Sequence, residues 1–314
     1  VSTTEPGSPV YLWVNPKYET VDTLSDPEAL ELLRNADKVY AHNVYFEHAM
    51  LWAKGLPQVR IRLEQWRCTM AMARVAGLPE SLDKLGDALG LKQRKDPRGK
   101  RLIKMFCVPQ KDTDQFIAPH EAPEDWLDFC NYCRYDVEAE KQAHRRLGYF
   151  ELAGDSLATF QFDLRMNLRG IPVNVHALRR AQAALDEVNT EVVDKFQALT
   201  NLNPTQRDRV LELLQSLGVP IKDMQADTLE GLQHVEGKAG EIIRLYSLLS
   251  YAATKKIPTM LRWACPDDRM RGVLKYYGAG TGRWTAGGPQ IQNAKKATKT
   301  MAPMTKELYA YLCR

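Results

Sequence analysis

The feature that most restricts how this chain can fold is a run of apolar residues spaced by three or four positions over residues 174–199. The run follows Asn174, a good N-cap residue, with spacings of 3, 3, 4, 3, 4, 4 and 3 between Val175, Leu178, Ala181, Leu185, Val188, Val192, Phe196 and Leu199. This period predicts one amphipathic helix of about 26 residues, roughly 39 Å long. A helix of that length indicates an elongated, mainly helical domain.

The first 150 residues show a different pattern, in which strands and helices alternate. Segments rich in β-branched and aromatic residues predict strands at 10–14 and 38–43. Capping residues (Ser25 or Asp26 for the first), closing glycines and apolar spacing predict helices at 25–35, 46–55, 67–77 and from Pro123 on. The expected organisation is therefore an α/β domain over residues 1–150 and a mainly helical region over 151–314.

Composition indicates a globular protein without a membrane span. Apolar residues make up 44% and charged residues 26% of the 314, and no apolar run reaches the length of a transmembrane helix. The six cysteines lie in a sequence without secretory marks, which favours free thiols in a reducing cytoplasm. The pair Cys130 and Cys133 has no second pair or His motif nearby, so a zinc site is disfavoured.

The net charge of +4 is unevenly distributed. Residues 251–314 hold twelve Lys and Arg against three acidic residues, so this part carries +9 and the rest −5. A polyanion such as nucleic acid is the natural partner of such a segment, and a solvated basic face is the alternative. A second basic stretch at 91–104, broken by Gly and Pro, is expected to be a mobile loop that either follows DNA or is merely solvated.

Two pairs of residues carry the elements of a metal-dependent site. Asn43 and Glu47 are four positions apart where a strand becomes a helix, and Tyr132 and Asp136 are four apart on one helical face. A carboxylate from each helix, with a phenol to orient water, is suited to hold a divalent metal against a phosphodiester. Each pair alone is more simply explained by a surface Glu and a capping or salt-bridged Asp.

The segment TGRWTAGGPQIQN, residues 281–293, has one arginine among small, aromatic and amide residues and no carboxylate. It lacks the titratable groups of an acid–base site, the ligands of a metal site and the alternation of a plain hairpin. Small residues permit close backbone approach, and an arginine can donate hydrogen bonds. The segment is therefore interpreted as a surface that contacts a ligand.

Taken together, these motifs resemble those of a known family. Asn43 to Glu47 and Tyr132 to Asp136 resemble the second and third motifs of proofreading 3'-5' exonuclease domains, which have a ribonuclease H-like fold. The segments FDLRMNLRGIPVN, NLNPTQRDRVLELLQSLGVP and YYGAGTGRWTAGGPQIQN resemble, in order, the exonuclease-to-thumb junction, the thumb and the Thr-Gly-Arg element of family A DNA polymerases. The similarity is greatest to the phage and bacterial proofreading branch.

The resemblance implies roles for individual residues. Glu47, Tyr132 and Asp136 would be catalytic in the exonuclease, with Glu47 and Asp136 binding metal; Glu47 stands where Asp is more common. Primer-template DNA and single-stranded 3' ends would be the partners, contacted by Asn43, Lys255, Lys256, Thr281, Arg283, Gln292 and Asn293. Arg283 would reach minor-groove acceptors. For the two lysines, a helix C-terminus that favours positive charge is the alternative explanation.

The sequence also departs from the family. An Asp-x-Glu on a first strand and the palm aspartates are not found, and no Asp follows Asp268. The complete enzyme is expected to use two-metal sites with Mg²⁺ or Mn²⁺ in a bacterial cell or phage-infected host, whereas residues 1–314 alone are expected to be largely inactive. Either a partial gene product or one piece of a split polymerase, completed by a second chain that carries palm and fingers, would account for this departure. The alternatives are a stand-alone 3'-5' exonuclease and a non-catalytic DNA-binding subunit of a split polymerase.

Overall fold

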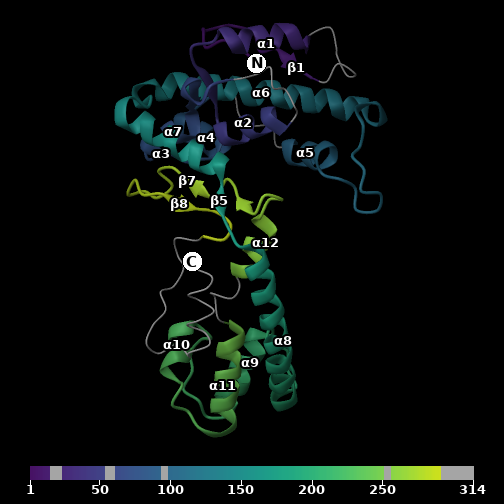
Figure 1. Cartoon of the computed structure of the whole chain (residues 1–314), viewed down its shortest axis with the longest axis vertical. Helices are drawn as coiled ribbons and strands as arrows, with labels where there is room; N and C mark the ends of the chain where they lie inside the picture. The colour runs from purple at the N-terminus through teal and green to yellow at the C-terminus, as the bar shows by residue number, and fades with distance from the viewer. Residues whose placement is uncertain (15–22, 54–60, 93–97, 251–255, 291–314) are drawn as a thin grey trace. The chain divides into compact units, whose positions relative to one another are not determined.

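The structure, a computed structural model, describes residues 1–14, 23–53, 61–92, 98–250 and 256–290. Internal contacts divide the chain into two compact units, whose α-helices are labelled in Figure 1. The first unit contains Val1–Arg169 and Leu274–Thr285, and the second contains Gly170–Val273 and the residues from Ala286 on. The segment around Arg283 therefore belongs to the first unit. The assignment of functions to residues 1–150 and 151–314 stays a prediction.

The strands of the first unit are short and pair in twos. β1 (Leu12–Trp13) is parallel to β2 (Thr23–Leu24), and β3 (Val39–Ala41) is parallel to β4 (Trp66–Cys68). The strands expected at 10–14 and 38–43 are present in shortened form, and mixed α and β content is confirmed. Among the described residues no sheet exceeds two strands, so the ribonuclease H-like sheet stays a prediction.

Within the described residues, seven α-helices form most of the first unit. Short 3₁₀ turns lie at Leu63–Gln65, Pro119–Glu121 and Gly148–Phe150. The α-helices are α1 (Asp26–Asn35), α2 (Val44–Ala53), α3 (Thr69–Val75), α4 (Leu82–Leu89), α5 (Gly99–Cys107), α6 (Pro123–Leu147) and α7 (Gly154–Arg169). The first begins as expected, since the main-chain N–H of Ser25 donates to Glu28 Oε2 at 3.0 Å.

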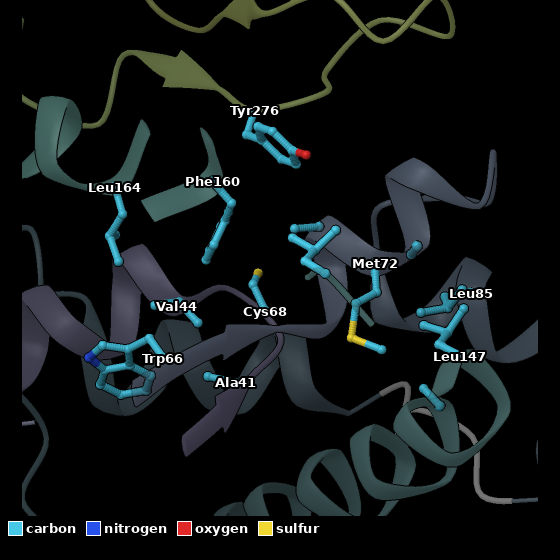
Figure 2. Close-up of a cluster of buried hydrophobic side chains, with 14 of the residues drawn as sticks. Ala41, Val44, Trp66, Cys68, Met72, Leu85, Leu147, Phe160, Leu164 and Tyr276 are labelled. Carbon is cyan, nitrogen blue, oxygen red and sulfur yellow. The ribbon is translucent and has the colours of Figure 1, made fainter. Parts of the chain in front are cut away.

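The core of the first unit is built around strand β4 and helices α3, α6 and α7. Trp66, Met72, Leu147 and Leu164 are almost fully buried there. Figure 2 shows that Tyr276 faces this cluster together with Phe160, and the two ring centroids are 5.8 Å apart. Burial of these side chains is the main stabilising contribution to the unit. The Tyr276 ring thereby attaches the 274–285 segment to the core.

The basic stretch at 91–104 is not a loop throughout, because residues from Gly99 on form α5. Leu102 and Phe106 bury the apolar side of this short helix against α6. Two of its cations are paired, since Arg98 contacts Asp128 and Arg101 contacts Asp125. The expectation of a mobile loop was therefore wrong for residues 99–104, where burial of an apolar side outweighs the solvation of the charges.

The second unit contains the predicted long helix. α8 spans Val175–Thr200, with 26 residues, and Asn174 Oδ1 accepts a hydrogen bond from the N–H of Ala177 at 2.9 Å as its N-cap. Phe196 on α8 is fully buried in a core that includes Val210, Leu214, Ile242 and Ile243. The other elements are β5 (Ile171–Pro172), α9 (Arg207–Ser216), α10 (Ala226–Gly231), α11 (Gly237–Ser250), α12 (Lys256–Trp263) and β6 (Arg269–Met270), which is antiparallel to β5.

Candidate nucleic-acid interface

The Thr-Gly-Arg element lies at the end of a small hairpin. β7 (Leu274–Lys275) and β8 (Thr285–Ala286) form its two-stranded sheet. Between them, the N–H of Gly282 donates to the carbonyl of Ala279 at 2.9 Å, and the N–H of Ala279 donates to the carbonyl of Arg283 at 3.1 Å. These bonds define a tight turn that ends at Arg283.

Two positions in this hairpin require glycine. Gly282 has a φ of +79°, a conformation that residues with a Cβ rarely adopt, and a Cβ there would lie 2.9 Å from the Tyr277 ring. A Cβ at Gly278 would collide with the side chain of Thr285. The small residues of the segment thus serve close packing within the hairpin itself, in addition to any approach of a ligand.

Thr281 and Arg283 face solvent. Both side chains are exposed, as is that of Trp284. Among the described residues, the Arg283 guanidinium has no hydrogen-bond partner. An exposed guanidinium on a turn fixed by backbone bonds can donate several hydrogen bonds to an acceptor in one plane.

Helix α7 holds both strands of the hairpin. The indole N–H of Trp284 donates to Asp163 Oδ1 at 2.6 Å. The Asn167 amide donates to the carbonyl of Leu274 at 3.1 Å and accepts from its N–H at 2.9 Å. The segment FDLRMNLRGIPVN was identified from the sequence, but Asp163 and Asn167 within it were not predicted as site residues. Their spacing of one helical turn was the only indication in the sequence.

A second group of polar contacts joins the hairpin to α3. Arg74 donates to Glu80 Oε2 at 2.7 Å and to the carbonyl of Tyr276 at 3.2 Å, and Lys275 donates to Glu80 Oε1 at 3.4 Å. The Arg74 guanidinium lowers the pKa of Glu80, so the carboxylate stays ionised at neutral pH. The hairpin is therefore held on two sides within the first unit.

The predicted exonuclease carboxylates lie near a third that the sequence reasoning missed. Burial raises the pKa of Glu47, in the first turn of α2, to about 7. Burial raises the pKa of Glu140 on α6 to about 8, and the charges of Glu47 and Asp136 add to the rise. Glu47 and Asp136 thus both lie within electrostatic reach of Glu140. Glu140 is one turn beyond Asp136, and that spacing was the available signal.

Glu47 and Glu140 share the wall of a cavity of about 1060 Å³ in the first unit. Apolar and aromatic side chains form much of this wall, including those of Trp13, Phe46 and Met50. Phe46 and Met50 are also substantially exposed, although they lie next to the carboxylate. The cavity combines apolar surface with acid groups, which is the usual composition of a ligand pocket.

The other two expected exonuclease residues lie in different surroundings. Asn43 is exposed just before α2. Tyr132 is 5% exposed, and its ring stacks on Phe129 with centroids 6.1 Å apart, in a cluster that also contains Leu102 and Phe106. The structure therefore gives Tyr132 a packing role beneath α5. Its expected catalytic role stays a prediction.

The described residues do not form a ready metal centre. No group of three His, Cys, Asp or Glu side chains among them is placed to hold an ion. The described cysteines are free thiols, and burial raises the pKa of Cys133 to about 12. Glu47 Oε2 is a buried oxygen without a hydrogen-bond partner in the described part of the chain. This oxygen of Glu47 could therefore still bind a ligand. The described carboxylates, however, do not complete a two-metal site.

Lys256 is the first described residue of α12, and α11 is described as far as Ser250; residues 251–255 lie outside the described part of the chain. The Lys256 ammonium donates to the carbonyl of Gln290 at 2.9 Å. Lys255, Gln292 and Asn293 lie outside the described residues, so their expected DNA contacts stay predictions.

A search for helices able to cross a lipid bilayer found none in the part of the chain that the structure describes. No family model matches the sequence. Relationship is therefore shown by comparison with individual proteins.

The comparisons confirm the resemblance to DNA polymerases, and the chain is related to a segment of such an enzyme. The DNA polymerase of Bacillus phage SP02 is 32% identical over 283 residues, which cover 87% of this chain and 43% of the phage protein. The chain thus spans less than half the length of this relative.

A solved structure shows a similar fold. The POL domain of Pol1 from M. smegmatis, in complex with DNA primer-template and dNTP, matches with a TM-score of 0.55 over 91% of this chain and 48% of that chain. Its sequence identity is 15%, so this comparison supports the fold alone.

Proposed function

We propose that the chain is the part of a family A DNA polymerase that binds primer-template DNA, joined to the counterpart of a 3'-5' exonuclease domain. The sequence relationship to a phage DNA polymerase supports the general class. The net charge of +9 in residues 251–314 supports a polyanionic partner. Membership of family A rests on the Thr-Gly-Arg element and the segments around it.

The observation that carries this proposal is the exposed Arg283 on a hairpin with a fixed backbone. Its guanidinium is free of partners among the described residues, while the turn beneath it is closed by backbone hydrogen bonds and the glycines at 278 and 282. Binding costs conformational entropy of both the arginine side chain and the backbone that carries it. Because this backbone is already fixed, only the side-chain part of that cost remains.

The chemistry of the minor groove suits a single arginine. Purine N3 and pyrimidine O2 are acceptors at every Watson–Crick pair, so one guanidinium can bind any correct terminal pair without reading its sequence. A mismatched pair displaces these acceptors. Arg283 would therefore sense the shape of the primer terminus, with Thr281 beside it.

In the exonuclease counterpart, Glu47 and Asp136 are the residues that would hold a divalent metal. In a complete site the metal would activate water and stabilise charge on the phosphodiester. The residues of this chain would supply carboxyl groups beside an apolar cavity, where a terminal base can pack. Because the described carboxylates do not form a three-ligand group, we expect weak or absent exonuclease activity from residues 1–314.

The experiment that tests the proposal measures the binding of a primer-template duplex by this chain. The terminal purine is either normal or 3-deaza, which lacks the N3 acceptor. Arg283→Ala should weaken binding of the normal duplex by roughly 1 to 3 kcal/mol and should abolish the difference between the two duplexes. Arg283→Lys should not restore it, because an ammonium lacks the planar fork.

The matched control is Arg146→Ala, which removes an exposed arginine near the end of α6 and changes the net charge equally. It should leave the difference between the two duplexes unchanged. Equal responses of wild type and Arg283→Ala to the 3-deaza substitution would show that Arg283 does not contact the groove.

A further inference from the structure

Asp163 and Asn167 are an unusual pair of residues on α7. Five polar or charged residues are buried among those that the structure describes, and these two are 6% and 4% exposed. They lie one helical turn apart, and Asn167 Nδ2 donates to Asp163 Oδ2 at 3.1 Å. Buried polar groups destabilise a protein unless they are hydrogen-bonded, so their partners identify what they are arranged to hold.

Asn167 acts as a strand partner for the hairpin. Its side-chain amide makes the same pair of bonds with the main chain of Leu274 that a neighbouring β-residue would make, at 2.9 and 3.1 Å. β7 therefore pairs with β8, and its residue Leu274 is also hydrogen-bonded to the Asn167 side chain. This fixes where the first strand of the hairpin lies on α7.

Asp163 holds the second strand through a side chain. The indole of Trp284 is 40% exposed, yet its N–H reaches the buried carboxylate at 2.6 Å. Trp284 directly follows Arg283, so this bond fixes the backbone on the C-terminal side of the arginine. With Asn167 at Leu274, both ends of the segment that contains the turn are attached to one helix.

The two anchors lie on either side of the turn that carries Arg283. Between them, the turn is closed by the bond from Ala279 to the Arg283 carbonyl at 3.1 Å. An apolar pair at 163 and 167 would pack against the hairpin equally well but would not specify its register. We propose that Asp163 and Asn167 are positioning residues that hold the hairpin so that Arg283 is aimed at the minor groove.

This inference rests on the proposed function, and its test separates the two. Binding of the normal and 3-deaza duplexes by the 314-residue chain is compared for wild type, Asn167→Leu and Trp284→Phe. Wild type should bind the normal duplex roughly ten-fold or more tightly than the 3-deaza duplex. In both variants the ratio should fall toward one, as is expected for Arg283→Ala, while the dependence of binding on salt stays unchanged.

Two control variants report on general effects. Asn189→Leu changes an exposed asparagine on α8, and Trp52→Phe changes a tryptophan on α2 that is 82% exposed. Both should keep the wild-type ratio. Circular dichroism checks that each variant is folded. If Asn167→Leu does not fold, Trp284→Phe decides alone, because it removes one donor from a partly exposed ring.

The outcomes are distinct. A wild-type ratio of one contradicts the proposed role of Arg283 itself and with it the inference. A large wild-type ratio that persists in folded Asn167→Leu and in Trp284→Phe overturns the inference and leaves the proposed function intact. Loss of the ratio in both variants, with the controls unchanged, supports the positioning role, because a merely structural contribution would weaken both duplexes alike.

Discussion

The Thr69 hydroxyl donates a hydrogen bond to Glu140 Oε1 across 3.1 Å, which links the start of α3 to the second half of α6. The same hydroxyl lies 3.0 Å from Nδ1 of His42, whose Nε2 is 2.8 Å from the carbonyl of Glu80. A continuous polar path therefore runs from Glu140 to the main-chain carbonyl of Glu80, whose carboxylate also binds Arg74 and Lys275.

The raised pKa values of Glu47 and Glu140 predict that stability depends on pH. In the unfolded chain these carboxyls titrate near 4.5, whereas in the folded chain they titrate near 7 and 8. Between these values the folded state binds more protons, so the free energy of unfolding should fall as pH rises from 4.5 to 8, by up to about 1.4 kcal/mol per pH unit for each carboxyl.

Urea denaturation of wild type and Glu140→Gln between pH 5 and 9 tests this prediction. His48 and His144 act in the opposite direction, since burial lowers their pKa values, so the difference between variant and wild type is the quantity to compare. The free energy of unfolding of Glu140→Gln should increase relative to that of wild type as pH rises. Glu212→Gln, at an exposed site on α9, is the control and should follow wild type.

Divalent metal should bind weakly at the carboxylates near the cavity. Mn²⁺ at 100 times its dissociation constant would add about 2.7 kcal/mol to the free energy of unfolding, because it binds the folded state. Glu47→Gln and Asp136→Asn should each reduce this increment, whereas Glu212→Gln should not. Thermal unfolding with and without Mn²⁺ measures it. An equal increment in all four proteins would place the ion elsewhere.

Neutralising Lys255 and Lys256 tests the contribution of phosphate contacts to DNA binding. The double change to Ala should weaken binding to all duplexes alike and reduce the slope of log K against log salt by roughly 0.9 for each phosphate that is no longer neutralised. Binding titrations at several salt concentrations measure the slope. An unchanged slope would mean that neither ammonium contacts phosphate, and for Lys256 the bond to Gln290 would then be its whole role.

Gly99→Ala tests the packing of α5 against α6. A Cβ at this position would overlap the Tyr132 ring, which is buried and stacked on Phe129, so the ring or the helix must shift. We expect the free energy of unfolding to fall by about 1–3 kcal/mol, measured by urea denaturation. Gly148→Ala is the control, since a Cβ there meets nothing within 4 Å. A neutral Gly99→Ala would show that α5 packs loosely on α6.

The local elements were predictable because neighbouring residues decide them. The spacing of apolar residues and the cap at Asn174 determined α8, and Ser25 with Glu28 determined the start of α1. Both depend on residues three or four positions apart, where side chains on a helix meet. The relationship to DNA polymerases was also contained in short motifs, since their chemistry is tied to residue type and spacing.

What only the tertiary structure decided are the contacts between residues far apart in the chain. Residues 99–104 appear as a charged loop in the sequence, and they form part of a helix because α6 offers an apolar surface and two carboxylates. Tyr132 matches a catalytic motif, yet the same helix packing buries its ring. In each case the environment that outweighs the local pattern comes from another element.

The candidate interface shows the same division. The sequence by itself identified Arg283 and the small residues around it, because their types are suited to DNA contact. It did not identify Asn167 as the partner of Leu274, because the two are 107 positions apart and no local period relates them. Folding brings them together beside the core that contains Tyr276. The burial that follows makes each of their hydrogen bonds necessary, since an unbonded polar group there would give up its hydrogen bonds to water and gain nothing in return.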